Sequence, residues 1–555
     1  MYYKRILFFV FIILSCLPSF AQLSHGGKPY PFSLYKAAIS SIVMPEFNMQ
    51  QALDESLTID EASGKKPFSF AWNYDLSLSP ENSGNWTQTA DGTRIWRIRL
   101  VSKKAKAISI DFKKFQLQKG SSVFIYPPSQ EFFIGGFNEL NNNESKSLPT
   151  SLISGDELIV ELQVIPELND YGSLEIGGLV HAYIDIFNTE EQANLKSGSC
   201  NVDINCPEGK DWQTVKKAIC KFTFKVGSST QACTGTLINN TSFDSIPYLL
   251  TANHCITYAS QATTAVFYFN YEADSCKSTA KTAQISLAGS SLLATSDSID
   301  FSLLKLFETP PSIYKPYYVG WNLSVTPASS ATCIHHPSGD VKKISLENDA
   351  LTSVYQDNIP EALLWLVNES LPQAFWRVVE WETGTTEGGS SGAPLFNQNK
   401  LLVGNLTGGQ ASCANSVNDY FSKFYVGWDH YADSSKQLKY WLDPINSGST
   451  FIYGFNPFGL PDTAIVDTIV YGPRFSIFPN PAIKNVVFET DSLDISGGTF
   501  SIYTILGKKV AQYSILEPNR LSFDVSFLEQ GIYIVEFSKG NIRERKKLMV
   551  LNEEQ

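Results

Sequence analysis

The distribution of cysteines constrains the fold of this chain more than any other feature of its sequence. Of nine cysteines in 555 residues, the first, Cys16, lies in an apolar N-terminal run and the other eight fall between residues 200 and 413. These eight are Cys200, Cys206, Cys220, Cys233, Cys255, Cys276, Cys333 and Cys413. An even number of cysteines in an exported chain predicts disulfide bonds. We therefore expect four bridges, all within one central domain.

The N-terminus has the pattern of a secretory signal peptide. Lys4 and Arg5 precede an apolar run over residues 6–17, and a small-x-small site predicts cleavage between Ala21 and Gln22. A lipid anchor at Cys16 is the alternative, because residues 13–16 loosely resemble a lipobox, but the cleavage site downstream is better formed. No later run has the 18 to 20 or so apolar residues of a membrane-spanning helix, so we expect no transmembrane span.

Length and charge limit the classes of protein that this chain can belong to. A chain of 555 residues is too long for a single core, so several domains are expected. With 18% charged and 43% hydrophobic residues the composition is that of a globular protein. The net charge of −12 argues against a nucleic-acid partner. We expect a monomer.

Strand patterns run through the whole chain and predict a mainly β protein. In residues 94–100 and 108–112 polar and apolar side chains alternate, which is typical of half-buried strands. Leu438, Trp441 and Leu442, followed by Pro444, predict a late helix. We divide the chain into a signal peptide (1–21), a β-sandwich-like N-terminal region (22–196), a central domain (197–457), a linker (458–473) and a C-terminal β-sandwich domain (474–555). The N-terminal region is either a binding module or a pro-segment.

Three short motifs in the central domain supply the parts of a nucleophilic relay. His254 follows Thr-Ala-Asn, Asp300 opens the apolar stretch 301–306, and Ser391 lies within Gly-Ser-Ser-Gly-Ala-Pro. A serine hydroxyl needs a base such as imidazole, and a carboxylate must orient that imidazole. Asp297, in a polar stretch, is the alternative carboxylate. The order His, Asp, Ser is that of the chymotrypsin-type double β-barrel.

The glycines around Ser391 fit a site for an oxyanion. Gly389 and the glycine after Ser391 allow the chain to turn tightly, so that the amides of Gly389 and Ser391 can face one point. The other histidines do not form a metal pattern: His335 and His336 are adjacent and are expected to be one core and one surface residue. We expect neither a metal nor a cofactor.

The central domain resembles the bacterial lysyl endopeptidases, secreted chymotrypsin-fold serine proteases that cleave after lysine. The matching stretches are 199–209, 232–237, 334–337, 441–444 and 449–452. The resemblance implies His254, Asp300 and Ser391 as the triad and Gly389 in the oxyanion hole. It also implies the disulfides Cys200–Cys413, Cys206–Cys276 and Cys233–Cys255. Cys220 and Cys333 are extra to the family pattern, so we expect them to pair with each other.

The resemblance also bears on specificity. Thr385 stands six residues before Ser391, where trypsin-like enzymes place an aspartate. The family pattern puts the acidic residue after the nucleophile, in a segment that matches Asn418-Asp419-Tyr420, so Asp419 is the expected base of the pocket and Glu387 a rival. A histidine of the family is replaced by Thr407. We therefore expect a looser lysine preference that extends to arginine.

A lysine-directed activity offers a route to maturation. Lys196-Ser197 lies just before Cys200, and cleavage there would release the N-terminal region as a pro-segment. The new N-terminus would be tethered by the bridge of Cys200 to Cys413.

The C-terminal domain contains four short signals, at 478–481, 506–508, 531–535 and in the basic finish before 548–551. With these signals it resembles the sorting domain (type A) of the type IX secretion system of Bacteroidetes. The resemblance implies the secretion machinery as a partner, export through the periplasm, and a secreted or outer-membrane-attached product. A glycan-binding β-sandwich is the alternative.

Together these patterns predict a secreted serine endopeptidase that is made as a zymogen and cleaves protein or peptide substrates after lysine through an acyl-enzyme. The alternative is a non-catalytic cell-surface binding protein on a decayed protease scaffold. Intact His254, Asp300 and Ser391 argue against it, because a scaffold without activity need not keep all three.

Overall fold

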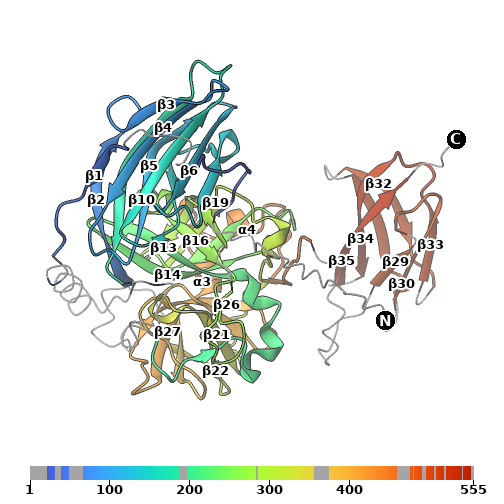
Figure 1. The fold of residues 1–555 in the computed structure, drawn as a ribbon. Helices are drawn as coiled ribbons and strands as arrows, with labels where there is room; N and C mark the ends of the chain where they lie inside the picture. The colour runs from blue at the N-terminus through green and yellow to red at the C-terminus, as the bar shows by residue number, and fades with distance from the viewer. Residues whose placement is uncertain are drawn as a thin grey trace, which may run out of the picture. The chain divides into compact units, whose positions relative to one another are not determined.

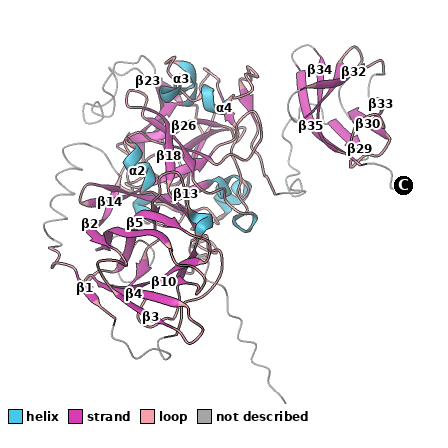
Figure 2. Cartoon of the chain, turned by 90° about the horizontal axis from the view of Figure 1, so that it is seen from above, coloured by secondary structure: helices cyan, strands magenta, loops and turns pink. Residues whose placement is uncertain are grey.

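β-Strands far outnumber helices among the residues that the structure describes, as the alternating side-chain pattern predicts, and the mainly β class is confirmed (Figure 2). The structure, a computed structural model, describes residues 22–31, 39–48, 50, 67–184, 186, 197–282, 285–354, 374–458, 475–478, 480–490, 495–504, 508–517, 520–539 and 542–551. The predicted signal peptide with Ala21, the candidate processing residue Lys196 and nearly all of the linker lie outside these residues. The chain divides into two compact units, Met1–Pro461 and Asp462–Gln555.

The N-terminal region is built from two layers of strands. One sheet has the order β1-β4-β10-β6-β7, with β3 paired to β4. Its strands are β1 (Ser41–Val43), β3 (Asn85–Gln88), β4 (Arg94–Val101), β6 (Ser121–Tyr126), β7 (Ile134–Phe137) and β10 (Glu157–Val164). The second layer consists of β2 (Phe68–Leu78), β5 (Ala107–Leu117), β8 (Leu148–Pro149), β9 (Ile153–Ser154) and β11 (Gly172–Ala182). Buried side chains of both layers form one core, for example Trp96 of β4 and Phe112 of β5.

The central domain contains two groups of paired strands. The first runs β17-β16-β13-β14-β15-β19-β18, and its two end strands are joined through Gly289. Its strands are β13 (Ile219–Val226), β14 (Ser229–Leu237), β15 (Tyr248–Thr251), β16 (Val266–Phe269), β17 (Ile285–Ala288), β18 (Ser290–Ser296) and β19 (Phe301–Leu306).

The second sheet of the central domain has the order β12-β22-β21-β25-β26-β27-β24-β23, and β20 and β28 join it at β26. An isolated bridge between Leu346 and Thr383 links β22 to the segment after β24 and so closes the sheet. The strands are β12 (Val202–Asp203), β20 (Trp321–Asn322), β21 (Ala331–His335), β22 (Lys343–Glu347), β23 (Thr352–Val354), β24 (Phe375–Glu380), β25 (Pro394–Asn397), β26 (Leu402–Gly409), β27 (Val417–Lys423) and β28 (Phe451–Ile452). The domain also contains the short helices α2 (Ala259–Thr263), α3 (Phe424–Asp429) and α4 (Lys439–Leu442).

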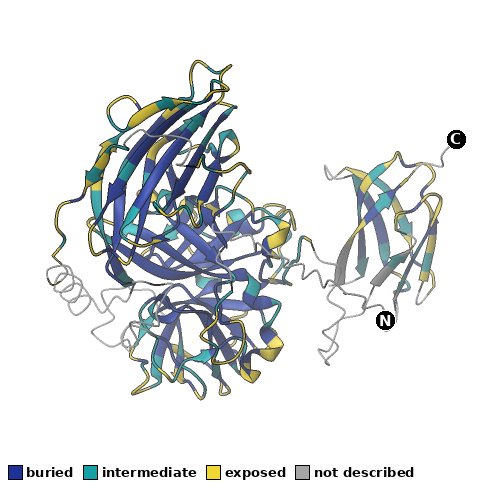
Figure 3. Cartoon of the chain, in the orientation of Figure 1, coloured by how far each residue is buried: buried dark blue, intermediate teal, exposed yellow. Residues whose placement is uncertain are grey.

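The N-terminal region and the central domain share a sheet. β2 pairs antiparallel with the first half of β14, from Ser229 opposite Trp72 to Ala232 opposite Phe68, while the second half of β14 pairs with β15. The strands of the two parts therefore run side by side in Figure 1, and residues coloured as buried continue from one part into the other in Figure 3. This continuity explains why the two parts form one compact unit.

The C-terminal domain is a small two-layer structure. One sheet has the order β29-β30-β33 and the other β32-β31-β34-β35. The strands are β29 (Phe475–Phe478), β30 (Asn485–Thr490), β31 (Thr499–Thr504), β32 (Lys509–Ser514), β33 (Arg520–Asp524), β34 (Gly531–Lys539) and β35 (Ile542–Val550). Phe488, Phe500 and Phe537 meet in the core between the sheets. Among the residues described for the whole chain, no helix has both the length and the apolar character needed to cross a membrane.

Candidate active site

Strand register brings His254 and Asp300 together. β15 pairs antiparallel with β19, and Thr251 at the end of β15 lies opposite Ser302 near the start of β19. His254 in the turn after β15 therefore meets Asp300, which directly precedes β19. The Nδ1–H of His254 donates to Oδ2 of Asp300 at 2.9 Å, and the His254 backbone N–H donates to Oδ1 at 3.0 Å. These two bonds fix both the tautomer and the orientation of the imidazole.

Asp300, not Asp297, is the carboxylate at this histidine. Asp300 is only 1% exposed, whereas Asp297 is exposed and accepts a hydrogen bond from the N–H of Ser298. Asp300 has a φ of +58°, in the left-handed region that side chains rarely adopt. The side-chain amide of Asn405, on β26 of the second sheet, donates to the Asp300 carbonyl at 3.0 Å and so holds this conformation.

The loop that carries Ser391 packs against the segment that leads to His254. The N–H of Thr234 in β14 donates to the carbonyl of Ser391 at 2.9 Å. Gly392 has a φ of +79°, and a Cβ there would stand 2.1 Å from the Thr251 hydroxyl oxygen, so only glycine fits. Ser391, 3% exposed, is thus held beside the residues just before His254.

Nε2 of His254 is the free end of the imidazole among the described residues. Within the described parts of the chain, this buried nitrogen has no hydrogen-bond partner, and Ser391 Oγ does not bond to it. Hydrogen bonds between a nucleophile and its base are commonly long in a free enzyme and shorten when substrate binds.

The oxyanion loop, which we define as residues 387–391, presents amides without acceptors. Among the described residues, the N–H groups of Gly389 and Ser391 donate to no partner. Gly389 has a φ of +91°, and its carbonyl accepts a hydrogen bond from the Thr234 hydroxyl at 2.9 Å, which directs the carbonyl into the protein. Two amides held in this way can receive the negative charge that develops on a carbonyl oxygen.

Sequence reasoning missed the support for this loop, which comes from His335. Its Nδ1 lies 2.8 Å from the Ser390 hydroxyl and its Nε2 lies 3.1 Å from the Ser345 hydroxyl. The Ser390 oxygen also accepts the N–H of Glu387 at 3.2 Å. Burial lowers the pKa of His335 to about 3, with a smaller contribution from Lys343, so the ring is neutral.

The expectation of one core and one surface histidine at 335 and 336 is wrong, because both are fully buried. Their side chains do point to opposite faces of the strand, but each face is covered. His335 faces the oxyanion loop, and His336 stacks on Tyr271 and donates from Nδ1 to the Asp340 carbonyl at 2.9 Å. Burial, reinforced by Lys342, lowers the pKa of His336 well below its usual value.

Asp419 is hydrogen-bonded to the segment that directly precedes the oxyanion loop. It is 1% exposed on β27, and its Oδ2 accepts hydrogen bonds from Trp381 Nε1 at 2.7 Å and the Thr386 hydroxyl at 2.6 Å. A Cβ on Gly409 would stand 2.1 Å from Asp419 Oδ1. The carboxylate is therefore enclosed between residues 385–386 and 408–409. Thr385, which directly precedes Thr386, is fully buried.

Three disulfides hold the central domain together. The structure contains Cys200–Cys413, Cys206–Cys276 and Cys233–Cys255. The expected Cys220–Cys333 bridge is wrong, because both residues are free, buried thiols. Cys220 packs in the core of the first sheet and Cys333 in a separate core of the second sheet, so pairing would require one of them to leave its core. Burial raises the pKa of both thiols.

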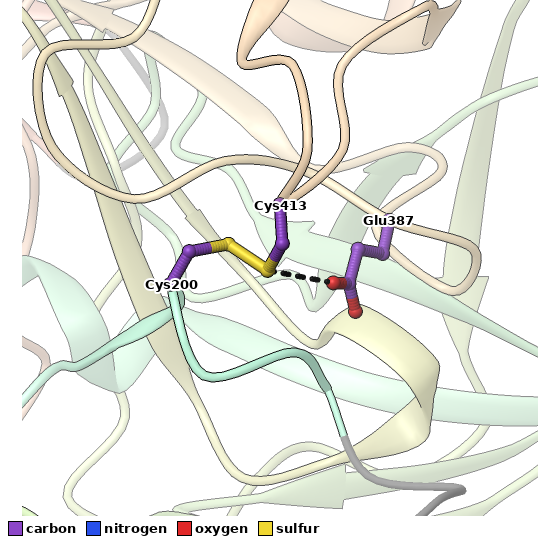
Figure 4. A group of neighbouring side chains, drawn as sticks. All are labelled: Cys200, Glu387 and Cys413. Carbon is purple, nitrogen blue, oxygen red and sulfur yellow. Dashed lines mark hydrogen bonds between the residues drawn. A yellow bond between two sulfur atoms is a disulfide. The ribbon is translucent and has the colours of Figure 1, made fainter.

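Glu387, the alternative to Asp419 as the base of the specificity pocket, lies next to a disulfide. Its Oε1 is 3.4 Å from Cys413 Sγ of the Cys200–Cys413 disulfide (Figure 4). The sulfurs of Cys200 and Cys413 are bonded to each other, so these three residues are not a set of free metal ligands.

Two protein families and a curated relative match parts of this chain. The family model "Lysyl endopeptidase, C-terminal domain" matches residues 195–422, and "Secretion system C-terminal sorting domain" matches residues 476–551. A lysyl endopeptidase of Pseudomonas aeruginosa is 29% identical over 365 residues, which cover 61% of this chain and 74% of that protein.

Two solved structures are also similar to part of the chain. The thermostable serine protease AL20 from an extremophilic microorganism is 12% identical with a TM-score of 0.26, and the match covers 38% of this chain and 92% of that one. The protease Anisep of Arthrobacter nicotinovorans is 16% identical with a TM-score of 0.27, over 40% of this chain and 93% of that one. The two family matches and the curated relative confirm the resemblances found in the sequence. The chain is a lysyl endopeptidase-like, secreted serine protease that carries a C-terminal sorting domain of the type IX secretion system.

Proposed function

We propose that this protein is the zymogen of an endopeptidase that cleaves peptide bonds after lysine, with His254, Asp300 and Ser391 as its catalytic triad. The observation that carries the proposal is the buried hydrogen bond of 2.9 Å between His254 Nδ1 and Asp300, beside the loop of Ser391. His254 Nε2 takes the proton of the Ser391 hydroxyl as the oxygen attacks the carbonyl carbon of the substrate. Asp300 stabilises the imidazolium that forms.

The amides of Gly389 and Ser391 stabilise the oxyanion of the tetrahedral intermediate. When this intermediate collapses, His254 gives its proton to the leaving amine and an acyl-enzyme remains on Ser391. Water, deprotonated by the same histidine, then hydrolyses the acyl-enzyme. No step needs a metal ligand or a cofactor.

Asp419 supports a preference for lysine. Its carboxylate is buried close to the segment that ends at Ser391, and two neutral donors, Trp381 and Thr386, keep it oriented. A lysine ammonium that enters this enclosed site meets a negative charge in a medium of low dielectric constant. Thr385 is next to Thr386 in the sequence and Thr407 lies two residues before Gly409, and both hydroxyl-bearing side chains are buried. We expect lysine to be preferred and arginine to be accepted more slowly.

The N-terminal region acts as the pro-segment in this proposal. Its strand β2 reaches Phe68, which pairs with Ala232, only two residues before Thr234, whose amide binds the Ser391 carbonyl. We call the contact between the N-terminal region and the central domain the seam. It also contains an ion pair of Lys225 in β13 with Asp111 in β5. The pro-segment therefore occupies the sheet edge that approaches the nucleophile. Cleavage between Lys196 and Ser197 would separate the two chains, and signal peptidase would act between Ala21 and Gln22.

Labelling and substrate experiments test this function. The purified full chain, allowed to mature, should react with an organophosphonate and hydrolyse lysyl faster than arginyl peptides and leave glutamyl peptides intact. Ser391→Ala should abolish labelling and lower kcat by about 10⁴-fold or more. Preference for glutamyl peptides would contradict the role of Asp419. Maturation of Ser391→Ala at Lys196 in the absence of other proteases would contradict self-processing.

A further inference from the structure

The two residues that follow the proposed cleavage site are each bound to a carboxylate. The hydroxyl of Ser197 donates to Oδ2 of Asp340 at 2.7 Å. The N–H of Gly198 lies 3.0 Å from Oε1 and 3.2 Å from Oε2 of Glu387. In Figure 4 the Glu387 carboxylate points at the disulfide that anchors this stretch of chain.

Both carboxylates belong to the surroundings of Gly389. Glu387 opens the oxyanion loop, and Asp340 ends the turn of residues 336–340. The N–H of Ser338 in this turn donates to the Gly388 carbonyl at 2.5 Å, and its hydroxyl donates to Glu387 Oε2 at 3.3 Å. A Cβ on Gly389 would stand 2.9 Å from the His336 carbonyl oxygen, so turn and loop are in direct contact.

Cleavage changes the charge at this place. Water adds to the Lys196 carbonyl, the C–N bond to Ser197 breaks, Lys196 keeps a carboxylate and the Ser197 nitrogen takes a proton to become an α-ammonium group. Such a group ordinarily titrates near pH 8, so it is charged at neutral pH. In the uncleaved chain the same nitrogen is a neutral peptide N–H.

The disulfide tether keeps the new ammonium group close to Asp340 and Glu387. Only residues 197–199 precede Cys200, and the bridge to Cys413 holds Cys200 beside Glu387. Standard bond lengths place the Ser197 nitrogen within about 6 Å of the Asp340 carboxylate that its own hydroxyl binds. Among the described residues, Glu387 meets neutral donors and no cation. Lys343 is 3.9 Å from Asp340, but its closer partner is Asp203, at 2.5 Å.

The oxyanion loop offers no other carboxylate. The residue directly before the nucleophile is Ser390, and its hydroxyl is already bound to His335 at 2.8 Å. We infer that the α-ammonium group created on Ser197 binds Asp340 and Glu387 and thereby clamps the turn 336–340 to the oxyanion loop. Asp340 and Glu387 are then positioning residues that act through the Gly389 amide. This inference rests on the cleavage after Lys196 proposed above.

Removing the charge from the new N-terminus tests the clamp. The full-length Ser197→Gln variant, matured and identified by N-terminal sequencing, is assayed before and after glutaminyl cyclase, which converts an N-terminal glutamine to neutral pyroglutamate with release of ammonia. We expect cyclisation to lower kcat about tenfold with KM nearly unchanged, since a hydrogen bond to a charged group contributes roughly one decade in an equilibrium. Ser197→Ala, which keeps its ammonium under the same treatment, is the matched control.

A second arm leaves Ser197 intact. The groups that face the ammonium are Asp340, Glu387 and Lys343, together with the buried, neutral His336 imidazole. Carboxylates raise the pKa of an ammonium, so kcat of the mature enzyme should fall at alkaline pH as the ammonium loses its proton. The Glu387→Gln, Asp340→Asn double variant should have a lower kcat and lack this alkaline fall. Glu208→Gln, at an exposed carboxylate, should retain the wild-type profile.

The outcomes separate the two proposals. A mature chain that starts elsewhere than residue 197 overturns the cleavage proposal and the clamp with it. A chain that starts at residue 197 but keeps its kcat after cyclisation, or a double variant with an unchanged alkaline fall, overturns the clamp alone.

Discussion

The Asp300 carboxylate binds His254 at both the ring and the backbone, so changing its chemistry without its shape is informative. Asp300→Asn should lower kcat by about 10⁴-fold, because an amide that donates to Nδ1 leaves the imidazole in the wrong tautomer. The measurement is kcat on a lysyl peptide near neutral pH. Asp297→Asn is the matched control, since Asp297 is exposed. Equal losses in the two variants would contradict the assignment.

Asp419 sets the second prediction for a single residue. Asp419→Asn should lower kcat/KM for lysyl substrates by about 10²-fold or more relative to substrates with a neutral side chain, because the buried charge that attracts the ammonium is gone. Phosphonate labelling of Ser391 should persist, which shows that the site still folds. Glu387→Gln should keep the lysine preference. The reverse pattern would make Glu387 the specificity residue.

Single residues could be assigned from the sequence where their role depends on neighbouring residues in the same short motif. The proposed triad could be named from the sequence because each member sits in a motif whose neighbouring residues have a local structural role, such as the glycines beside Ser391. The support from His335 and Asn405 could not be predicted, because each of them bonds to a residue that is far away in the sequence and comes close only in the folded chain. Strand alternation places His335 and His336 on opposite faces, but it does not say that both faces are covered.

The disulfide next to His254 gives a prediction at the scale of elements. Cys233–Cys255 closes a separation of 22 residues and ties the turn of His254 to β14. Replacing both cysteines with alanine should lower the free energy of unfolding by about 3 kcal/mol, according to the chain-entropy model. Because the turn is loosened, kcat should fall as well. Denaturant unfolding and steady-state kinetics measure the two effects.

The free thiols provide the control for that experiment. The denatured mature enzyme should contain two reactive thiols, from Cys220 and Cys333, since the other six cysteines of the central domain form three bridges. Cys333→Ala should remove one thiol and leave kcat almost unchanged. A count of zero reactive thiols would contradict this prediction and indicate that Cys220 and Cys333 form a fourth disulfide.

Elements were predictable where the side-chain pattern is local. Alternation at 94–100 and 108–112 corresponds to β4 and β5. The late helix is shorter than its apolar pattern indicates, because Asp433 caps a separate 3₁₀ turn, Ser434–Lys436, before α4 begins at Lys439. The even count of cysteines predicted a fourth bridge, but counting says nothing of which core each sulfur occupies.

At the scale of the whole molecule, the seam between the N-terminal region and the central domain contains a titratable group. Glu308 accepts a hydrogen bond from Asn141 at 2.8 Å, and burial raises the pKa of Glu308 to about 7. A carboxyl group with a raised pKa stabilises the assembled state while protonated, and this stabilisation is lost as the pH rises toward 7. After cleavage, the pro-segment should therefore dissociate more readily at pH 7 than at pH 5.

Gel filtration of the cleaved complex at both pH values measures this difference. Glu308→Gln, which stays neutral, should reduce it. Lys225, whose pKa burial lowers to about 8, titrates above this window and leaves the interval from pH 5 to 7 to Glu308. Equal pH dependence in wild type and Glu308→Gln would contradict the prediction.

The shared sheet could not be read from the sequence. β2 and β14 are far apart along the chain, and neither strand has a local pattern that names its partner. Once the pro-segment leaves, the backbone groups of residues 229–232 lose that partner and become an open strand edge, which is a template for aggregation. A chain made without residues 22–196 exposes this edge from the start of folding. Such a chain should therefore aggregate before any loss of activity can be measured. A charged side chain introduced on that edge should reduce the aggregation.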